Sequence, residues 1–168
     1  MVIDLLTGSG FDYDVFLSAH DEVRGLVQHK ILHQLESHDP PYKVCWHLRD
    51  FTVGLPINEQ IATSILRSRK ILFVFSEHFT ESQFCCSELD QALHRFQTTR
   101  TRCILPIVLN EDTVPKKLKS VLTYWPLVNL NDAHFPEKIT KLLGKLKLMH
   151  GTNQYNNKHN TIPLYIDF

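Results

Sequence analysis

The chain has 168 residues, and its 18 lysine and arginine side chains balance 18 aspartate and glutamate side chains. This length suits one domain with a substantial core. The balanced charge argues against a dedicated nucleic-acid binder or a polybasic membrane anchor. No stretch approaches the roughly 20 apolar residues that a membrane span needs. We therefore expect a soluble, cytoplasmic domain with no nucleic-acid partner and no membrane span in this chain.

Five short apolar runs predict buried strands, at residues 13–18, 42–47, 71–76, 103–109 and 125–130. The third run is continuously apolar, without alternation, which is typical of a strand buried on both faces at the centre of a parallel sheet. Pro106 removes a ladder donor from the fourth run, and this favours a bulge or a position near the sheet edge.

Amphipathic stretches between these runs predict helices, at residues 22–36, 58–67, 84–96 and 135–148, with a short helical piece at 118–122. We expect Asp21 and Asn58 to cap the first two helices. The basic cluster of Arg67, Arg69 and Lys70 suits the C-terminal end of the second helix.

Strand and helix thus alternate five times, which predicts an α/β fold. Right-handed crossovers leave few topologies, and we predict a flavodoxin-like, doubly wound, five-stranded parallel sheet of order 2-1-3-4-5 with helices on both faces. Residues 1–10 form a predicted leader, residues 11–148 the domain, and residues 149–168 a polar C-terminal tail.

The charge is unevenly distributed: residues 1–110 carry 10 basic and 13 acidic side chains, whereas residues 111–168 carry 8 and 5. Opposed charge of this kind suits self-association or pairing with a related domain. The four cysteines lie in apolar runs, and two of them are adjacent, which is awkward for an ordinary disulfide. Reduced thiols in the cytosol are the natural interpretation. No Cys-x-x-Cys or paired Cys/His spacing predicts a metal site, and we expect no cofactor.

Residues 47–57 form a predicted loop between the second strand and the second helix, a position where such folds often carry function. Arg49 and Asp50 lie side by side in it. Four apolar residues follow that look exposed: Phe51, Val53, Leu55 and Ile57. A purely connecting loop would not need so much apolar surface, so we consider a binding role. The alternative is that Phe51 and Ile57 fold back onto the core while the two charges solvate the turn.

Two functions that share this fold lack their motifs here. A flavin phosphate site would need a Ser-, Thr- and Gly-rich loop after the first strand, but the chain reads Ser-Ala-His-Asp-Glu at residues 18–22. No Gly-x-Gly-x-x-Gly or Walker loop occurs. A phosphoacceptor receiver would need an aspartate after strand three and a lysine after strand five, and neither is present.

Three stretches resemble motifs of Toll/interleukin-1 receptor (TIR) domains. Residues 11–18, Phe-Asp-Tyr-Asp-Val-Phe-Leu-Ser, resemble box 1, and residues 41–54 resemble box 2 with its Arg-Asp-Phe sequence. Residues 76–79, Ser-Glu-His-Phe, followed by Phe-Cys-Cys-Ser-Glu-Leu at 84–89, resemble a stretch of animal Toll-type receptors. The order and spacing match over residues 11–148. The resemblance is to the receptor and adaptor branch of animals.

This resemblance implies a signalling scaffold of innate immunity that binds the TIR domains of receptors or adaptors, and itself, through residues 47–57, which are called the BB loop in that family. Arg49, Asp50, Phe51 and Gly54 carry over directly. The predicted partner-binding residues are Arg49, Asp50, Phe51, Thr52, Val53, Gly54, Leu55 and Pro56. Val53 stands where the family usually has a proline that affects partner choice, and Pro136 stands at the usual tryptophan of box 3.

The same resemblance implies an enzymatic alternative, because some TIR domains cleave the nicotinamide bond of NAD. Glu88 occupies the position of their essential glutamate, where a carboxylate would stabilise an oxocarbenium-like state. The structural interpretation is an ion pair of Glu88 with Arg95 or Lys70. Whether the chain belongs to a receptor or to a free adaptor stays open at this point.

Overall fold

The computed structural model describes residues 10–110, 114, 116–119 and 125–147. The predicted tail lies outside the described residues, and so does the predicted leader except for Gly10. No helix within the described ranges has the length and apolar character to cross a membrane.

Five parallel strands form one sheet in the order β2-β1-β3-β4-β5. This confirms the predicted topology. Their bounds are β1 Tyr13–Ala19, β2 Val44–Trp46, β3 Ser68–Phe75, β4 Ile104–Val108 and β5 Val128–Asn129. The longest pairing joins β1 to β3, with Tyr13 opposite Ser68 and Ala19 opposite Val74.

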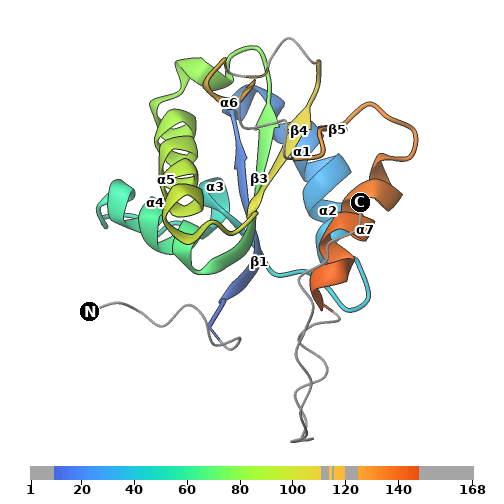
Figure 1. The fold of residues 1–168 in the computed structure, drawn as a ribbon, viewed down its shortest axis with the longest axis horizontal. Coiled ribbons are helices and arrows are strands. Elements are labelled where there is room, and N and C mark those ends of the chain that lie inside the picture. The colour runs from blue at the N-terminus through green and yellow to red at the C-terminus, as the bar shows by residue number, and fades with distance from the viewer. Residues whose placement is uncertain (1–9, 111–113, 115, 120–124, 148–168) are drawn as a thin grey trace, which may run out of the picture.

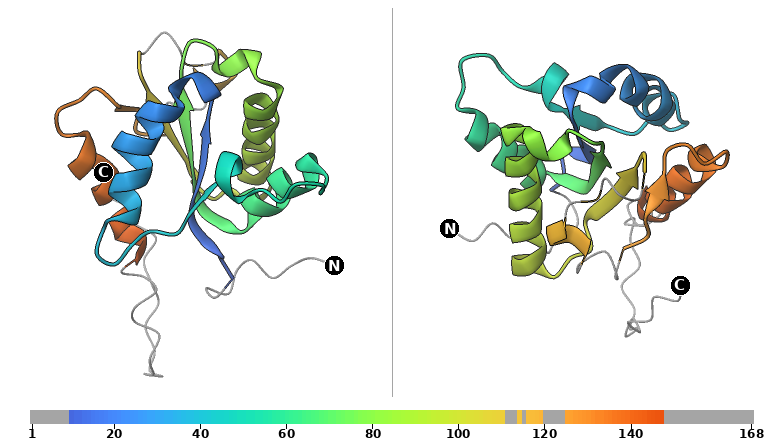
Figure 2. Two further views of the ribbon diagram at one scale, coloured as in Figure 1. Left: turned by 180° about the vertical axis from the view of Figure 1, so that it is seen from behind. Right: turned by 90° about the horizontal axis from the view of Figure 1, so that it is seen from above.

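Helices cover both faces of the sheet (Figure 1, Figure 2). One face carries a continuous helical stretch that includes a π-helical turn, together with α7; the other face carries α4 and α5. The bounds are η1 Asp21–Val23, α1 Arg24–Val27, η2 Gln28–Leu32, α2 His33–Glu36, α3 His47–Asp50, α4 Ile57–Leu66, η3 Phe79–Glu81, α5 Gln83–Thr99, α6 Lys116–Lys119 and α7 Phe135–Lys147.

Side chains of the central strands point alternately to the two faces, as the two-residue period of a strand requires. In β3, Leu72 and Val74 pack under α1, η2, α2 and α7, whereas Ile71, Phe73 and Phe75 pack under α4 and α5. All five are fully buried, so the continuous apolar run predicts the central strand correctly.

Both predicted helix caps are wrong. His20, not Asp21, precedes the first helix, and its Nδ1 accepts the backbone N–H of Glu22 at 3.3 Å. Asn58 lies inside α4, which begins one residue earlier at Ile57. The preceding proline has φ −57°, a value suited to a helix start, so the helix begins there without a side-chain cap.

Sheet pairing overrides one prediction and confirms another. Arg69 and Lys70 belong to β3 and not to the end of α4, because Lys70 pairs with Val15 of β1. β4 lies next to the edge strand, as Pro106 predicted. The two residues of β5 pair only with β4 residues 107 and 108, so at Pro106 the ladder has a strand partner on one side only.

The BB loop and the buried Glu88

The BB loop begins with a helical turn, α3 (His47–Asp50), and is therefore not irregular throughout as predicted. The turn follows β2 without a break. Asp50 stabilises it, since its Oδ2 accepts the backbone N–H of Trp46 at 2.7 Å. This bond satisfies a backbone donor at the start of the helical turn, where no helical partner exists.

Arg49 joins the turn to two other elements. Its Nη1 donates to Glu36 Oε1 at 2.7 Å, its Nη2 to the carbonyl of Val44 at 2.8 Å, and its Nε to Asp50 Oδ1 at 2.8 Å. The hydrogen bonds that Arg49 donates to Asp50 raise the pKa of Arg49 above its ordinary value; its hydrogen bond to Glu36 adds to this effect, and partial burial opposes it. Arg49 is thus a clamp within the domain, and its charge is already balanced there.

The tip of the loop is held by one glutamine of α4. Gln60 Oε1 accepts the backbone N–H of Thr52 at 2.7 Å, and Gln60 Nε2 donates to the carbonyls of Thr52 at 3.0 Å and Leu55 at 3.3 Å. Gly54 lies within this turn with φ 91°, a left-handed conformation that side chains rarely adopt. The side chain of Gln60 therefore supplies hydrogen-bond partners for backbone groups of the turn that lie outside any helix or strand.

Phe51 is half-buried, although the sequence suggested that it was exposed. Its ring lies 6.4 Å from that of Phe16 in β1 and 6.1 Å from that of His47. It packs against the core cluster beneath α4 and α5. Phe51 therefore anchors the loop, as the alternative interpretation of the sequence proposed for it.

The apolar residues after Phe51 do face solvent. Val53 is 99% exposed, Leu55 55% and Ile57 43%, while Pro56 is exposed at the start of α4. Phe84, 47% exposed at the start of α5, lies across from the loop. An exposed apolar surface on a monomeric domain is a candidate interaction site.

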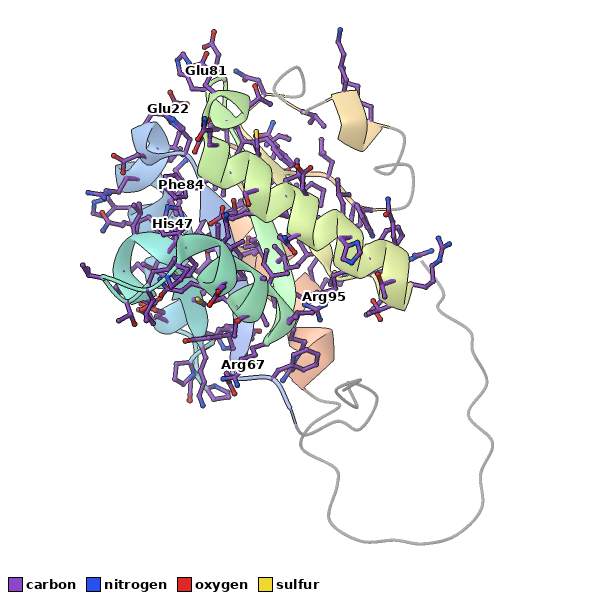
Figure 3. All side chains as sticks on the ribbon, turned by 90° about the vertical axis from the view of Figure 1, so that its left-hand side faces the viewer. Glu22, His47, Arg67, Glu81, Phe84 and Arg95 are labelled. Atoms are coloured by element: carbon purple, nitrogen blue, oxygen red, sulfur yellow. The ribbon has the colours of Figure 1, made fainter. Side chains whose placement is uncertain are left out.

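A cavity of about 530 Å³ separates the loop from the start of α5. Its lining includes His47, Phe51, Leu55, Gln60, Ser82 and Phe84. The rings of His47 and Phe84 are stacked, with centroids 6.4 Å apart and an interplanar angle of 14° (Figure 3). The loop thus overhangs a hollow and is not packed flat on the domain.

Glu88 lies on α5 and is fully buried. Ser18 Oγ donates to its Oε2, and His47 Nδ1 lies 3.1 Å from its Oε1. The predicted pairing with Arg95 or Lys70 is wrong. Arg95 instead donates to two main-chain carbonyls, at 2.5 and 2.6 Å, and Lys70 donates to a third.

Glu88 does not belong to the lining of the cavity, whereas His47 does. The Glu88 carboxylate therefore contacts the loop through His47, the first residue of α3, and contacts β1 through Ser18. It connects the loop to the sheet through these two contacts. Neighbouring Cys85 is buried, and this burial raises the pKa of its thiol to about 12, which leaves it in the unreactive protonated form. Packing, not nucleophilic chemistry, explains this cysteine.

Sequence reasoning missed three residues that hold the site: Glu36, Gln60 and His47. Glu36 is 13 positions from Arg49, and Gln60 is eight positions from Thr52. In neither pair do the partners share a helix or strand, so the periodicity within one helix or strand does not mark these pairs. Within the described ranges, no group of His, Cys, Asp or Glu side chains could hold a metal ion.

The fold and the loop define an α/β interaction domain, in which a parallel sheet carries a braced loop with an exposed apolar tip. A family model described as TIR domain matches residues 12–123, and the chain belongs to this family. The sequence is 36% identical over 126 residues to Toll-like receptor 2 of Mus musculus, and 37% identical over 125 residues to Toll-like receptor 2 type-2 of Gallus gallus. Each match covers 68% of this chain and 16% of the receptor.

Solved structures agree on the fold. The TIR domain of the Toll-related receptor TRR-2 from Hydra magnipapillata superposes with a TM-score of 0.58 at 23% identity, covering 83% of this chain and 97% of that one. A TIR-STING receptor from C. gigas, in complex with 2',3'-cGAMP, gives a TM-score of 0.64 at 19% identity, covering 82% and 41%. The receptor matches place the chain in the animal receptor branch of the family.

Proposed function

We propose that this domain is a cytoplasmic signalling scaffold of innate immunity that binds other TIR domains through the tip of the BB loop. Its relatives include Toll-like receptors, of which the chain spans about a sixth. The observation that carries the proposal is Val53, which is 99% exposed on a loop whose anchors all lie within the domain. TIR domains of receptors or adaptors are the partners it fits.

The tip offers enough apolar surface to drive binding. Fully burying a valine or leucine side chain contributes about 1.5–3 kcal/mol, and Val53, Leu55 and Ile57 all have surface left to bury. Because Gln60 already fixes the turn, binding does not have to order it, which lowers the entropic cost of association. Arg49, Asp50 and Phe51 support the tip from inside the domain.

The test is a titration of the purified domain against the TIR domain of a Toll-like receptor. Val53→Asp places a charge at the tip and should weaken binding by at least about tenfold, since a partner would have to desolvate it. Leu127→Asp is the matched control, because Leu127 is also an exposed apolar residue but lies outside the loop. Equal loss of affinity in both variants would show that the loop tip is not the binding surface.

A further inference from the structure

The loops that follow β1 and β3 form an acidic patch at the carboxyl end of the sheet. Four exposed carboxylates contribute: Asp21, Glu22, Glu77 and Glu81. Arg24, the first residue of α1, offsets one of them, with its Nε 2.9 Å from Asp21 Oδ1. His78 lies between Glu22 and Glu81, at 3.4 and 3.0 Å. α6, which carries exposed lysines, lies at the same end of the sheet but apart from these loops (Figure 2, Figure 3).

A basic patch lies at the opposite end, where α4 and α5 finish and β3 and β4 begin. Six cations contribute, of which Arg95 is buried beneath the surface and the other five are exposed or half-buried: Arg67, Arg69, Lys70, Arg95, Arg100 and Arg102. Two carboxylates offset them, Asp12 at 2.8 Å from Arg67 and Asp14 at 3.5 Å from Arg69. The patch therefore keeps a net charge of +4 from these eight residues.

The cations of this patch are close enough to affect one another. Burial, together with the charges of Arg95 and Arg102, lowers the pKa of Lys70. Lys70 and Arg95 donate to main-chain carbonyls and so hold the ends of the strands. Arg100 and Arg102 are exposed, and neither has a carboxylate partner in the described ranges. Among the described residues, these two side chains are therefore the exposed cations of the patch that no carboxylate offsets.

Both patches lie on one axis of the molecule. β3 starts in the basic patch and ends two residues before Glu77, and its eight residues span about 26 Å at 3.3 Å per residue. In Figure 3, Glu22 and Glu81 lie at one end of the domain, and Arg67 and Arg95 lie toward the other. A second copy shifted along this axis would bring unlike charges together.

We propose that the acidic patch of one copy of this chain docks on the basic patch of a second copy. The contact is heterologous, with two different surfaces meeting, so it repeats in an open chain unless a rotation closes it. Complementary charge gives such contacts orientation and fast association more than high affinity. The association is therefore weak and salt-sensitive, and it uses the two charged patches rather than the apolar tip of the BB loop.

A second copy fits the basic patch better than a nucleic acid does. The whole chain has 18 basic and 18 acidic side chains, so no net attraction draws it to a polyanion. The acidic patch on the same molecule would repel phosphates as the basic patch attracts them. Only a partner with both signs of charge satisfies both ends, and this chain is such a partner.

The experiment measures self-association by analytical ultracentrifugation at low salt and at about 0.5 M salt, where the screening length is only a few ångströms. Arg100→Glu/Arg102→Glu changes the net charge of the basic patch from +4 to zero, and Glu77→Arg/Glu81→Arg removes the net negative charge of the acidic patch. Each double variant alone should lose low-salt association by about tenfold or more. An equimolar mixture should regain it, because each variant supplies the charge that the other lacks.

Matched variants control for net charge alone. Lys30→Glu/Lys141→Glu and Glu59→Arg/Glu137→Arg change the charge by the same amounts at exposed sites outside both patches. Each should associate with itself as the wild type does. If the control mixture associates as strongly as the patch mixture, or if the patch variants keep wild-type association, the proposal is wrong. It is also wrong if the wild type binds a duplex oligonucleotide, and Arg100→Glu/Arg102→Glu removes that binding without affecting self-association.

Arg100→Glu/Arg102→Glu separates this inference from the proposed function. Both residues lie between α5 and β4, outside the BB loop, so the variant should lose low-salt self-association and keep the wild-type affinity for the TIR domain of a Toll-like receptor. Loss of self-association in Val53→Asp, with normal association in both charge-reversal variants, would assign the contact between copies to the BB loop instead.

Discussion

The base and the tip of the BB loop are held by different means and suit different tasks. At the base, Arg49 and Asp50 direct their hydrogen bonds to β2, to α2 and to each other. At the tip, Val53 and Leu55 touch little of their own domain and are exposed. The charged residues of the motif therefore brace the loop, and the apolar residues are left for a partner. A charged residue in a binding motif can therefore stabilise its own domain and need not contact the partner.

The largest expected loss of stability follows from replacing Glu88, which lies beneath the base of the loop. Glu88→Ala leaves the Ser18 hydroxyl and the His47 ring beside an empty buried site, and removing one partner of a buried polar cluster costs about 3 kcal/mol of unfolding free energy. Urea denaturation measures the loss. Glu59→Ala, at an exposed site on α4, should change stability by less than about 0.5 kcal/mol. Equal stability of both variants would contradict the bracing role of Glu88.

The same buried glutamate bears on the enzymatic alternative. Cleavage of NAD through Glu88 stays a prediction, and no contact of the described residues favours it. We expect the wild-type domain to consume no NAD at high protein concentration. Turnover that Glu88→Gln abolishes, in a variant whose unfolding curve shows that it is folded, would replace the scaffold proposal with an NAD-cleaving enzyme.

The next effect tests the clamp. Arg49→Met removes hydrogen bonds to Glu36, Val44 and Asp50, and we expect a loss of about 1–2 kcal/mol in unfolding free energy. Arg67→Met is the matched control, since Arg67 forms one ion pair with Asp12 between well-exposed side chains. Such a pair contributes about 0–1 kcal/mol. Thermal and urea unfolding of the two variants should rank them in this order.

A smaller effect is expected at Gln60. Gln60→Ala frees three backbone groups of the turn to solvent, with an expected loss of about 1 kcal/mol. Amide hydrogen exchange at Thr52 should accelerate, and affinity for a partner should fall because binding must then order the turn. Unchanged exchange at Thr52 would show that the turn does not depend on this side chain.

The smallest effect concerns pH. A hydrogen bond to the carboxylate of Glu81, with the negative charge of Glu22, raises the pKa of His78 above its ordinary value near 6.5. A raised pKa in the folded state means that the ion pair stabilises the domain fully below the unfolded pKa. This contribution is lost as the pH rises through the folded pKa. His78→Gln should remove this pH dependence from the unfolding free energy between about pH 6 and 8.

Much of the fold follows from local patterns. Continuous apolar runs predict the strands, and their alternation with amphipathic stretches predicts the sheet order, because buried parallel strands and right-handed crossovers permit few alternatives. The caps were wrong because side-chain geometry, not residue type, decides which atom reaches a free N–H. His20 accepts the bond that Asp21 was expected to accept.

The site could be located from the sequence but not described. The motif marks the loop, and Val53 and Leu55 are exposed as predicted. The roles of Phe51 and Glu88 depend on contacts between residues far apart in the chain, such as the 70 positions between Ser18 and Glu88. Both charged patches come from residues 12–102, so neither depends on the uneven charge between residues 1–110 and 111–168.

The most direct test of the account measures stability and partner affinity on the same two variants. Val53→Asp should unfold like the wild type, within about 0.5 kcal/mol, yet bind a Toll-like receptor TIR domain at least about tenfold more weakly. Arg49→Met should lose stability and keep more of its affinity than Val53→Asp does. If Val53→Asp unfolds early, or if it binds as tightly as the wild type, the division between a bracing base and a binding tip is wrong.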